Sequence, residues 1–218
     1  MKRFTLAAYA ALLAVVTAAP VVAADLPLPF KAAPTAAFNW TGFYAGVNGG
    51  YGWGKSNWTV SGTGATTGDF DTTGAMVGGT VGYNLQMSQF VVGFEGDIDA
   101  IWMKGTDATA CCQTANDWFA TARARLGYAM DRWMPFVTGG AAFGDVKMTT
   151  AAGSETATRI GWTAGAGLEY AFMGAWSAKI EYLYADLGNA SCSVATCGAA
   201  TDVSFKANIV RGGIDYHF

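Results

Sequence analysis

Alternation of apolar and polar residues with a period of two is the dominant pattern in this sequence. In residues 43–53, one face would carry Phe43, Val47, Tyr51 and Trp53, while the other is mostly glycine. Strict alternation indicates a β-strand whose two faces meet different surroundings. The same pattern recurs along the chain and predicts eight strands, with the faces of the fifth left undetermined: 43–53, 75–83, 90–102, 118–128, 135–147, 160–170, 176–184 and 210–218.

The segments between these strands alternate in length. Residues 85–89, 130–134 and 171–175 would form short turns, whereas four long polar loops are expected at 54–70, 104–117, 148–158 and 188–203. Each predicted strand approaches the ~9–11 residues that a tilted spanning strand needs. An even strand number with short turns at one end and long loops at the other is typical of outer-membrane barrels. The pattern therefore predicts an all-β fold, an eight-stranded antiparallel up-and-down transmembrane β-barrel.

Charged and aromatic residues distinguish this barrel from a soluble one. The aromatic residues near the strand ends all lie on the apolar face, as in the girdles of a lipid-facing wall: Trp53, Tyr83, Phe90, Trp102, Trp118, Tyr128, Tyr170, Trp176, Tyr184 and Phe218. An arginine facing lipid near the membrane midplane costs ~2–4 kcal/mol. A lumen network of ion pairs is therefore expected from the charged residues of the opposite face: Glu95, Asp97, Asp99, Arg123, Arg125, Glu169, Lys179, Glu181, Arg211 and Asp215.

Composition and the N-terminus agree with this class of protein. Charged residues make up only 13% of the chain, about half of what soluble domains carry, and there are 29 glycines. Residues 1–24 read as a signal peptide, with Lys2 and Arg3 before an apolar run and small residues ahead of Asp25. Residues 25–40 would be a proline-rich periplasmic segment, and 41–218 the outer-membrane barrel. Without Lys2 and Arg3 the 13 basic residues fall to 11 against 16 acidic ones, and the resulting net charge of −5 argues against nucleic acid as a partner.

Three segments carry a resemblance to a known family. Residues 39–54 (NWTGFYAGVNGGYGWG), 135–144 and 212–218 (GGIDYHF) resemble strands of the outer membrane immunogenic proteins, porin-family β-barrels of rhizobia and related Gram-negative bacteria, and of the wider OmpA/OmpX-like barrels. The resemblance implies a surface antigen or structural component of the cell envelope, in contact with outer-membrane lipid and lipopolysaccharide and with host or environmental surfaces. Ile214, Tyr216 and Phe218 resemble the C-terminal signal that the barrel-assembly machinery recognises.

Candidate chemistry in the chain is sparse. The signal peptide implies an oxidising compartment, in which Cys192 and Cys197 would close a short local disulfide, although cross-links to the adjacent pair Cys111 and Cys112 stay open. No metal or cofactor site is expected. His217 is the only histidine and no serine motif accompanies it, so a lipid hydrolase is a minor alternative. The second alternative is a narrow pore, which a side-chain-filled lumen disfavours.

Overall fold

A computed structural model describes residues 38–61, 63–106, 112–151, 153–197 and 199–218. The predicted signal peptide, most of segment 25–40 and Cys111 lie outside these residues. The described chain consists of eight strands and one short helix: β1 Gly42–Val60, β2 Phe70–Met87, β3 Phe90–Thr106, β4 Cys112–Tyr128, β5 Trp133–Thr150, β6 Gly153–Met173, β7 Trp176–Cys192, α1 Val194–Cys197 and β8 Thr201–His217. None of the described helices is long and apolar enough to cross a membrane.

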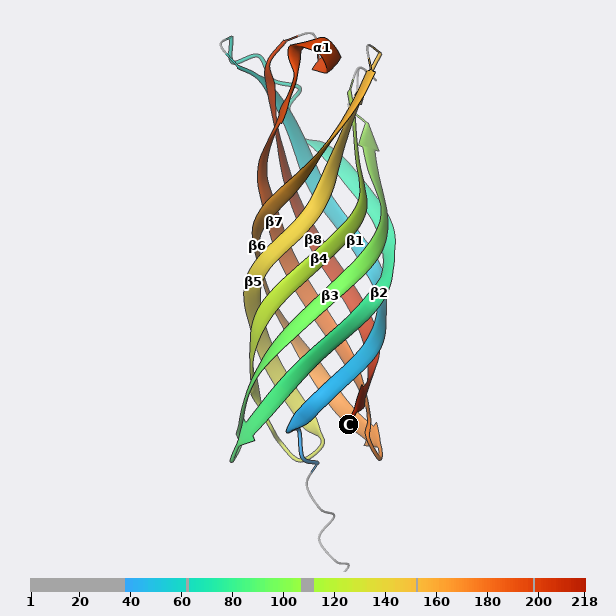
Figure 1. Ribbon diagram of the computed structural model, residues 1–218, viewed down its shortest axis with the longest axis vertical. Helices are drawn as coiled ribbons and strands as arrows, with labels where there is room; N and C mark the ends of the chain where they lie inside the picture. The colour runs from blue at the N-terminus through green and yellow to red at the C-terminus, as the bar shows by residue number, and fades with distance from the viewer. Residues whose placement is uncertain (1–37, 62, 107–111, 152, 198) are drawn as a thin grey trace, which may run out of the picture. The chain divides into compact units, whose positions relative to one another are not determined.

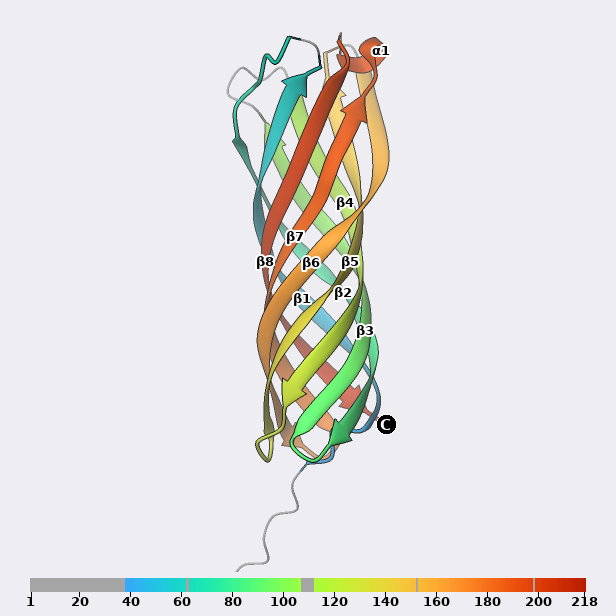
Figure 2. The same cartoon turned by 90° about the vertical axis from the view of Figure 1, so that its left-hand side faces the viewer.

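The strands form one closed barrel in sequence order (Figures 1 and 2). Each strand pairs antiparallel with the next, and β1 pairs with β8 from Tyr44 opposite His217 to Val60 opposite Thr201. Closure leaves no sheet edge unpaired, which is the condition for strands to cross a membrane. The predicted eight-stranded antiparallel barrel is therefore confirmed.

The strands are longer than predicted, and the four predicted long loops are too long, because strands occupy residues 54–60, 104–106, 112–117, 148–150, 153–158, 188–192 and 201–203 of them. Residues 54–60 and 201–207 pair in register across β1 and β8, and β5 and β6 stay paired as far as Thr150 and Gly153. The reason is that the outer face meets water beyond the lipid. Outward positions there become polar while inward ones, such as Trp58 and Phe205, are buried and apolar. The outward positions are thus polar and the inward ones apolar, the reverse of the pattern within the membrane. The sequence of these segments therefore resembles that of polar loops.

The fifth strand alternates weakly because both of its faces are apolar over much of its length. Met134, Phe136 and Ala142 of β5 are buried in the lumen, whereas Trp133 and Val137 are exposed on the outer wall. The structure therefore assigns the faces that the sequence leaves undetermined.

The outer wall is an apolar band with aromatic residues at both ends. Trp162 and Tyr184 pack at 5.3 Å between ring centroids toward the α1 end of the barrel, and Trp176 and Tyr216 at 5.0 Å toward the end with the C-terminus. Large apolar side chains lie exposed between them, among them Phe94 and Ile98. Such a surface is buried only in a lipid bilayer, so this exterior faces the membrane.

Three layers fill the interior. An apolar cluster that includes Trp58, Met148, Leu183 and Phe205 occupies the half nearer α1. Charged side chains occupy the middle. A second apolar cluster around Trp40 and four other buried residues closes the end with the C-terminus.

A charged lumen as candidate functional site

All ten charged residues predicted for the lumen point inward, and all are buried. They come from β3, β4, β6, β7 and β8, where each occupies a position that alternates with a lipid-facing one. The barrel thus brings together residues that are up to 120 positions apart in the sequence. Six carboxylates and four cations share one narrow space, and their contacts follow a clear order along the barrel.

Arg123 on β4 lies at the centre of this network. It forms ion pairs with Glu95, with Asp97 at 2.8 Å and with Glu181 at 2.6 Å. Its Nε donates a further hydrogen bond to Thr121 at 2.8 Å. The guanidinium therefore links β3 to β7 across the lumen, and every partner is buried with it.

Arg211 on β8 forms the second link. Its Nη1 lies 2.9 Å from an oxygen of Asp97 and 3.0 Å from Asp99, and its Nε donates to Glu181 at 2.9 Å. Asp97 and Glu181 are thus each held by two arginines. Asp99 has Arg211 as its sole ion-pair partner among the described residues, and its Oδ1 has no hydrogen-bond partner among them.

Arg125 and Lys179 continue the network toward the C-terminal end of the barrel. Arg125 pairs with Glu169, while Lys179 Nζ lies 2.9 Å from Glu95 and 3.3 Å from Asp215. The tyrosine hydroxyl of Tyr44 donates to Glu95 at 2.8 Å, a contact that the sequence analysis missed. The available signal was Tyr44 itself, an aromatic residue on the glycine-rich face of residues 43–53.

Glycines opposite the large lumen side chains make this packing possible. An alanine at Gly50 would place its Cβ against the carbonyl oxygen of Val210 and 2.6 Å from the Cβ of Arg211. Eight of the ten network residues have a glycine as a direct cross-strand partner: Gly46 for Asp215, Gly50 for Arg211, Gly78 for Asp99, Gly82 for Glu95, Gly93 for Arg125, Gly140 for Arg123, Gly167 for Glu181 and Gly213 for Lys179.

The structure also places a serine and an acid beside His217. Ser177 Oγ lies 3.0 Å from His217 Nε2 and donates to Glu169 at 2.5 Å, and Nε2 itself lies 3.3 Å from the same Glu169 oxygen. In a hydrolase triad the acid holds Nδ1 and leaves Nε2 to the serine. Here the buried Nδ1 has no hydrogen-bond partner among the described residues. Ser177 is also fully buried, so the arrangement does not match a triad.

Aromatic side chains surround His217 at the end of the lumen. The rings of Phe38, Trp40 and Tyr44 lie 5.3, 5.6 and 5.5 Å from the imidazole, measured between centroids. Trp40 is fully buried, and its backbone N–H donates to the side chain of Gln86 at 2.9 Å. Phe38 and Trp40, which we expected to belong to the proline-rich periplasmic segment, therefore pack into the mouth of the barrel.

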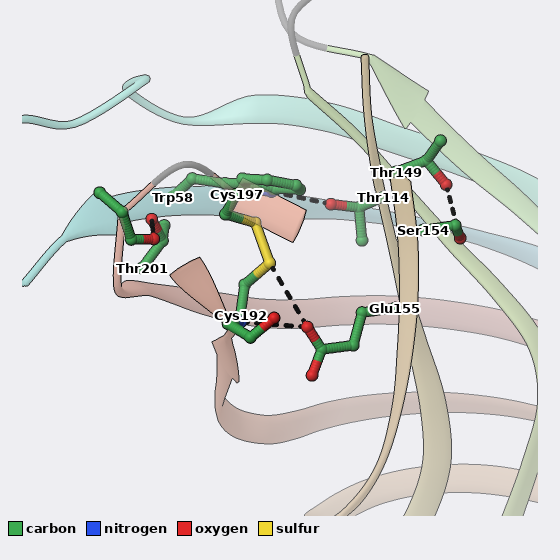
Figure 3. The surroundings of a disulfide bond; sticks show 10 residues. Trp58, Thr114, Thr149, Ser154, Glu155, Cys192, Cys197 and Thr201 are labelled. Atoms are coloured by element: carbon green, nitrogen blue, oxygen red, sulfur yellow. Dashed lines mark hydrogen bonds between the residues drawn. A yellow bond between two sulfur atoms is a disulfide. The ribbon is translucent and has the colours of Figure 1, made fainter. Parts of the chain in front are cut away.

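The remaining predicted site residues lie at the two ends. Ile214, Tyr216 and Phe218 project outward from the end of the chain, and Phe218 is 77% exposed. At the opposite end Cys192 and Cys197 are joined by a disulfide, with Glu155 accepting from the backbone N–H of Ser193 at 3.0 Å (Figure 3). The described residues contain no group of three or more His, Cys, Asp and Glu that could hold a metal ion.

A closed barrel with an apolar, aromatic-bounded exterior and an ion-paired lumen defines an integral outer-membrane β-barrel. Comparison with known proteins agrees. The model of the "Outer membrane protein beta-barrel domain" family matches residues 9–218, and the chain belongs to this family. Its place is the cell outer membrane.

Curated relatives carry outer-membrane names. The 31 kDa outer-membrane immunogenic protein of Brucella melitensis is 37% identical over the full length of both chains. The 25 kDa outer-membrane immunogenic protein of Brucella abortus is 30% identical, over 88% of this chain and 85% of that one. Among solved structures, Neisserial surface protein A is similar with a TM-score of 0.49 and 13% identity, over 82% of this chain and 98% of that chain.

Proposed function

We propose that this protein is a closed, structural and surface-exposed component of the outer membrane, and neither a channel nor an enzyme. The observation that carries this proposal is the filled lumen. Arg123 and Arg211 bind carboxylates from opposite walls, and the apolar cluster around Leu183 and Phe205 lies directly beyond them. An eight-stranded barrel is only wide enough for side chains to fill, so a solute has no path that avoids these groups.

Conductance of the purified protein in a planar lipid bilayer tests the closed state. We expect no steady openings from the monomer at membrane potentials that the bilayer tolerates. The variant Arg123→Ala should lose stability without acquiring a steady conductance, because Arg211 and Lys179 still occupy the lumen. Steady openings of the unmodified monomer would contradict the proposal and favour the narrow pore.

The surface role rests on the end of the barrel that carries α1. The start of β1, the C-terminus and the short turns lie at the other end, which in outer-membrane barrels is periplasmic, so the α1 end faces outward (Figure 1). Residues 61 and 63–69, together with residues 193–197 beside the Cys192–Cys197 disulfide, lie at this rim. The relatives' names describe immunogenic proteins, and we propose that this rim is the region to which antibodies and environmental surfaces bind.

Antibody binding to intact cells tests this surface role. Antibodies raised against the folded barrel should label intact cells, and exchange of residues 193–200 for a glycine–serine segment of equal length should reduce the labelling. A matched exchange at the opposite end, in the turn 129–132, should leave it unchanged. Labelling that requires permeabilised cells would show that the rim is not exposed.

A further inference from the structure

A cleft opens on the outer wall of the barrel, on the side formed by β7, β8, β1 and β2 near the α1 end. Its volume is about 580 Å³. Two lysines, Lys55 of β1 and Lys206 of β8, lie at its centre, and Trp53 and Tyr184 form its side nearer the apolar band. The cleft is separate from the lumen, because these side chains belong to the outward-facing positions of their strands.

The two lysines are direct cross-strand partners. Side chains in such a pair start ~4.5–5.5 Å apart, and like charges placed this way destabilise the sheet. Lys55 has Asp69 and Lys206 has Asp186 as its ion-pair partner, each at 3.9 Å, and both lysine side chains are more than half exposed. Such exposed and distant pairs contribute little. The two ammonium groups therefore retain the capacity to hold an anion between them.

The depth of the cleft in the membrane identifies the kind of anion. Trp53 and Tyr184 belong to the aromatic girdle at the outward end, and such rings lie at the level of lipid headgroups. Lys55 lies two residues beyond Trp53, roughly 7 Å along the strand at ~3.3 Å per residue. The ammonium groups are thus at the height where the phosphates of outer-leaflet lipids lie, with the apolar wall directly beneath them.

The charges that flank the lysine pair further limit the kinds of anion that the cleft can bind. Asp71 of β2 is the cross-strand partner of Lys55 on its other side, and it also lines the cleft. A row of acid, lysine, lysine and acid favours one phosphate at its centre and repels an extended polyanion. The carboxylates that line the cleft, Asp69 and Asp71, and the amide of Asn208 can form hydrogen bonds with sugar hydroxyl groups.

We propose that this cleft binds the phosphorylated sugar headgroup of an outer-leaflet glycolipid, with the phosphate between Lys55 and Lys206 and the acyl chains against the wall below Trp53. The site rests on the outer-membrane location and does not depend on whether the lumen is closed.

Binding of diphosphorylated lipid A tests the site. The barrel is reconstituted in phosphatidylcholine nanodiscs, and fluorescently labelled lipid A is titrated into them. Charge-assisted contacts of this kind are each worth on the order of tenfold in affinity, so the double variant Lys55→Gln, Lys206→Gln should bind at least about tenfold more weakly. The matched control is Lys147→Gln on β5, a lysine near the same end but four strands away from β1, which should bind like the unmodified protein.

Two further ligands identify the source of the phosphate. Lipid A from which both phosphates have been removed should bind as weakly to the unmodified protein as intact lipid A binds to the double variant. Inorganic phosphate at millimolar concentration should not displace the labelled lipid. Equal affinity of the double variant and the unmodified protein, equal binding of dephosphorylated lipid A, or displacement by inorganic phosphate would each overturn the proposal. All variants should keep the heat-modifiable gel mobility of a folded barrel, because Lys55 and Lys206 are exposed and Lys147 is partly exposed.

Discussion

Replacement of Arg123 by methionine should destabilise the barrel by about 3 kcal/mol. Removal of one partner from a buried ion pair generally costs about 3–5 kcal/mol, because the other charge stays buried without compensation. Here three carboxylates lose a partner, but each keeps another cation: Glu95 retains Lys179 at 2.9 Å, whereas Asp97 and Glu181 retain Arg211. We therefore expect the lower end of the range.

Asp99→Asn provides a control at the same depth in the lumen. The network holds more carboxylates than cations, and Asp99 shares Arg211 with two other acids. Loss of its charge should change the stability by less than about 1 kcal/mol, or raise it, because an excess buried charge disappears. Urea unfolding in phosphatidylcholine vesicles, followed by tryptophan fluorescence and heat-modifiable gel mobility, measures both variants. An Arg123→Met effect no larger than that of Asp99→Asn would refute the reasoning.

Three other perturbations follow from the packing. Gly50→Ala should destabilise the barrel by about 1–3 kcal/mol in the same urea assay, because its Cβ would meet β8; the lipid-facing Gly49→Ala, whose nearest contact is at 3.6 Å, should change it by less than about 1 kcal/mol. Phe218→Ala should reduce the yield of folded barrel in cells while the refolded protein keeps its stability, whereas Phe94→Ala, an equally lipid-facing ring, should assemble normally. Reduction of the disulfide should remove on the order of 2 kcal/mol of local loop-closure stability and expose residues 193–200 to protease, without shifting the unfolding transition of the barrel.

Much of the fold was accessible from the sequence because lipid imposes a strict rule on each strand. Within the bilayer an outward charge is costly, so the positions of Glu95, Arg123 and Arg211 define the inward face without any structural information. Eight strands follow from eight alternating segments, and five of these carry such charges. The rule acts only where the wall contacts lipid, however, and this limits how far the pattern can be followed.

Beyond the bilayer an outward charge carries no such cost, so the faces of the strands can no longer be predicted from the positions of the charged residues. Outward positions such as Lys55 and Lys206 are solvated, and inward ones such as Trp58 and Phe205 are apolar, so the strands continue with the opposite alternation. The apolar cluster that closes the outer half of the lumen was missed for the same reason. The meeting of Ser177 with His217 and Glu169 depends on register across β6, β7 and β8, which one strand's pattern does not contain.

The charged residues of the lumen influence how the strands assemble, in addition to their effect on the stability of the folded barrel. Well-packed apolar side chains could fill a lumen at equal or lower cost, because burial of charges carries a large desolvation penalty. A register shift of one residue, however, turns every side chain of a strand to the other face. On β4 such a shift would place both Arg123 and Arg125 in lipid, at about 2–4 kcal/mol each near the midplane. We infer that the network selects the correct register and the inside of the barrel. Replacement of all ten residues by apolar ones should therefore reduce the fraction of chains that fold to one barrel more than it reduces the stability of those that do.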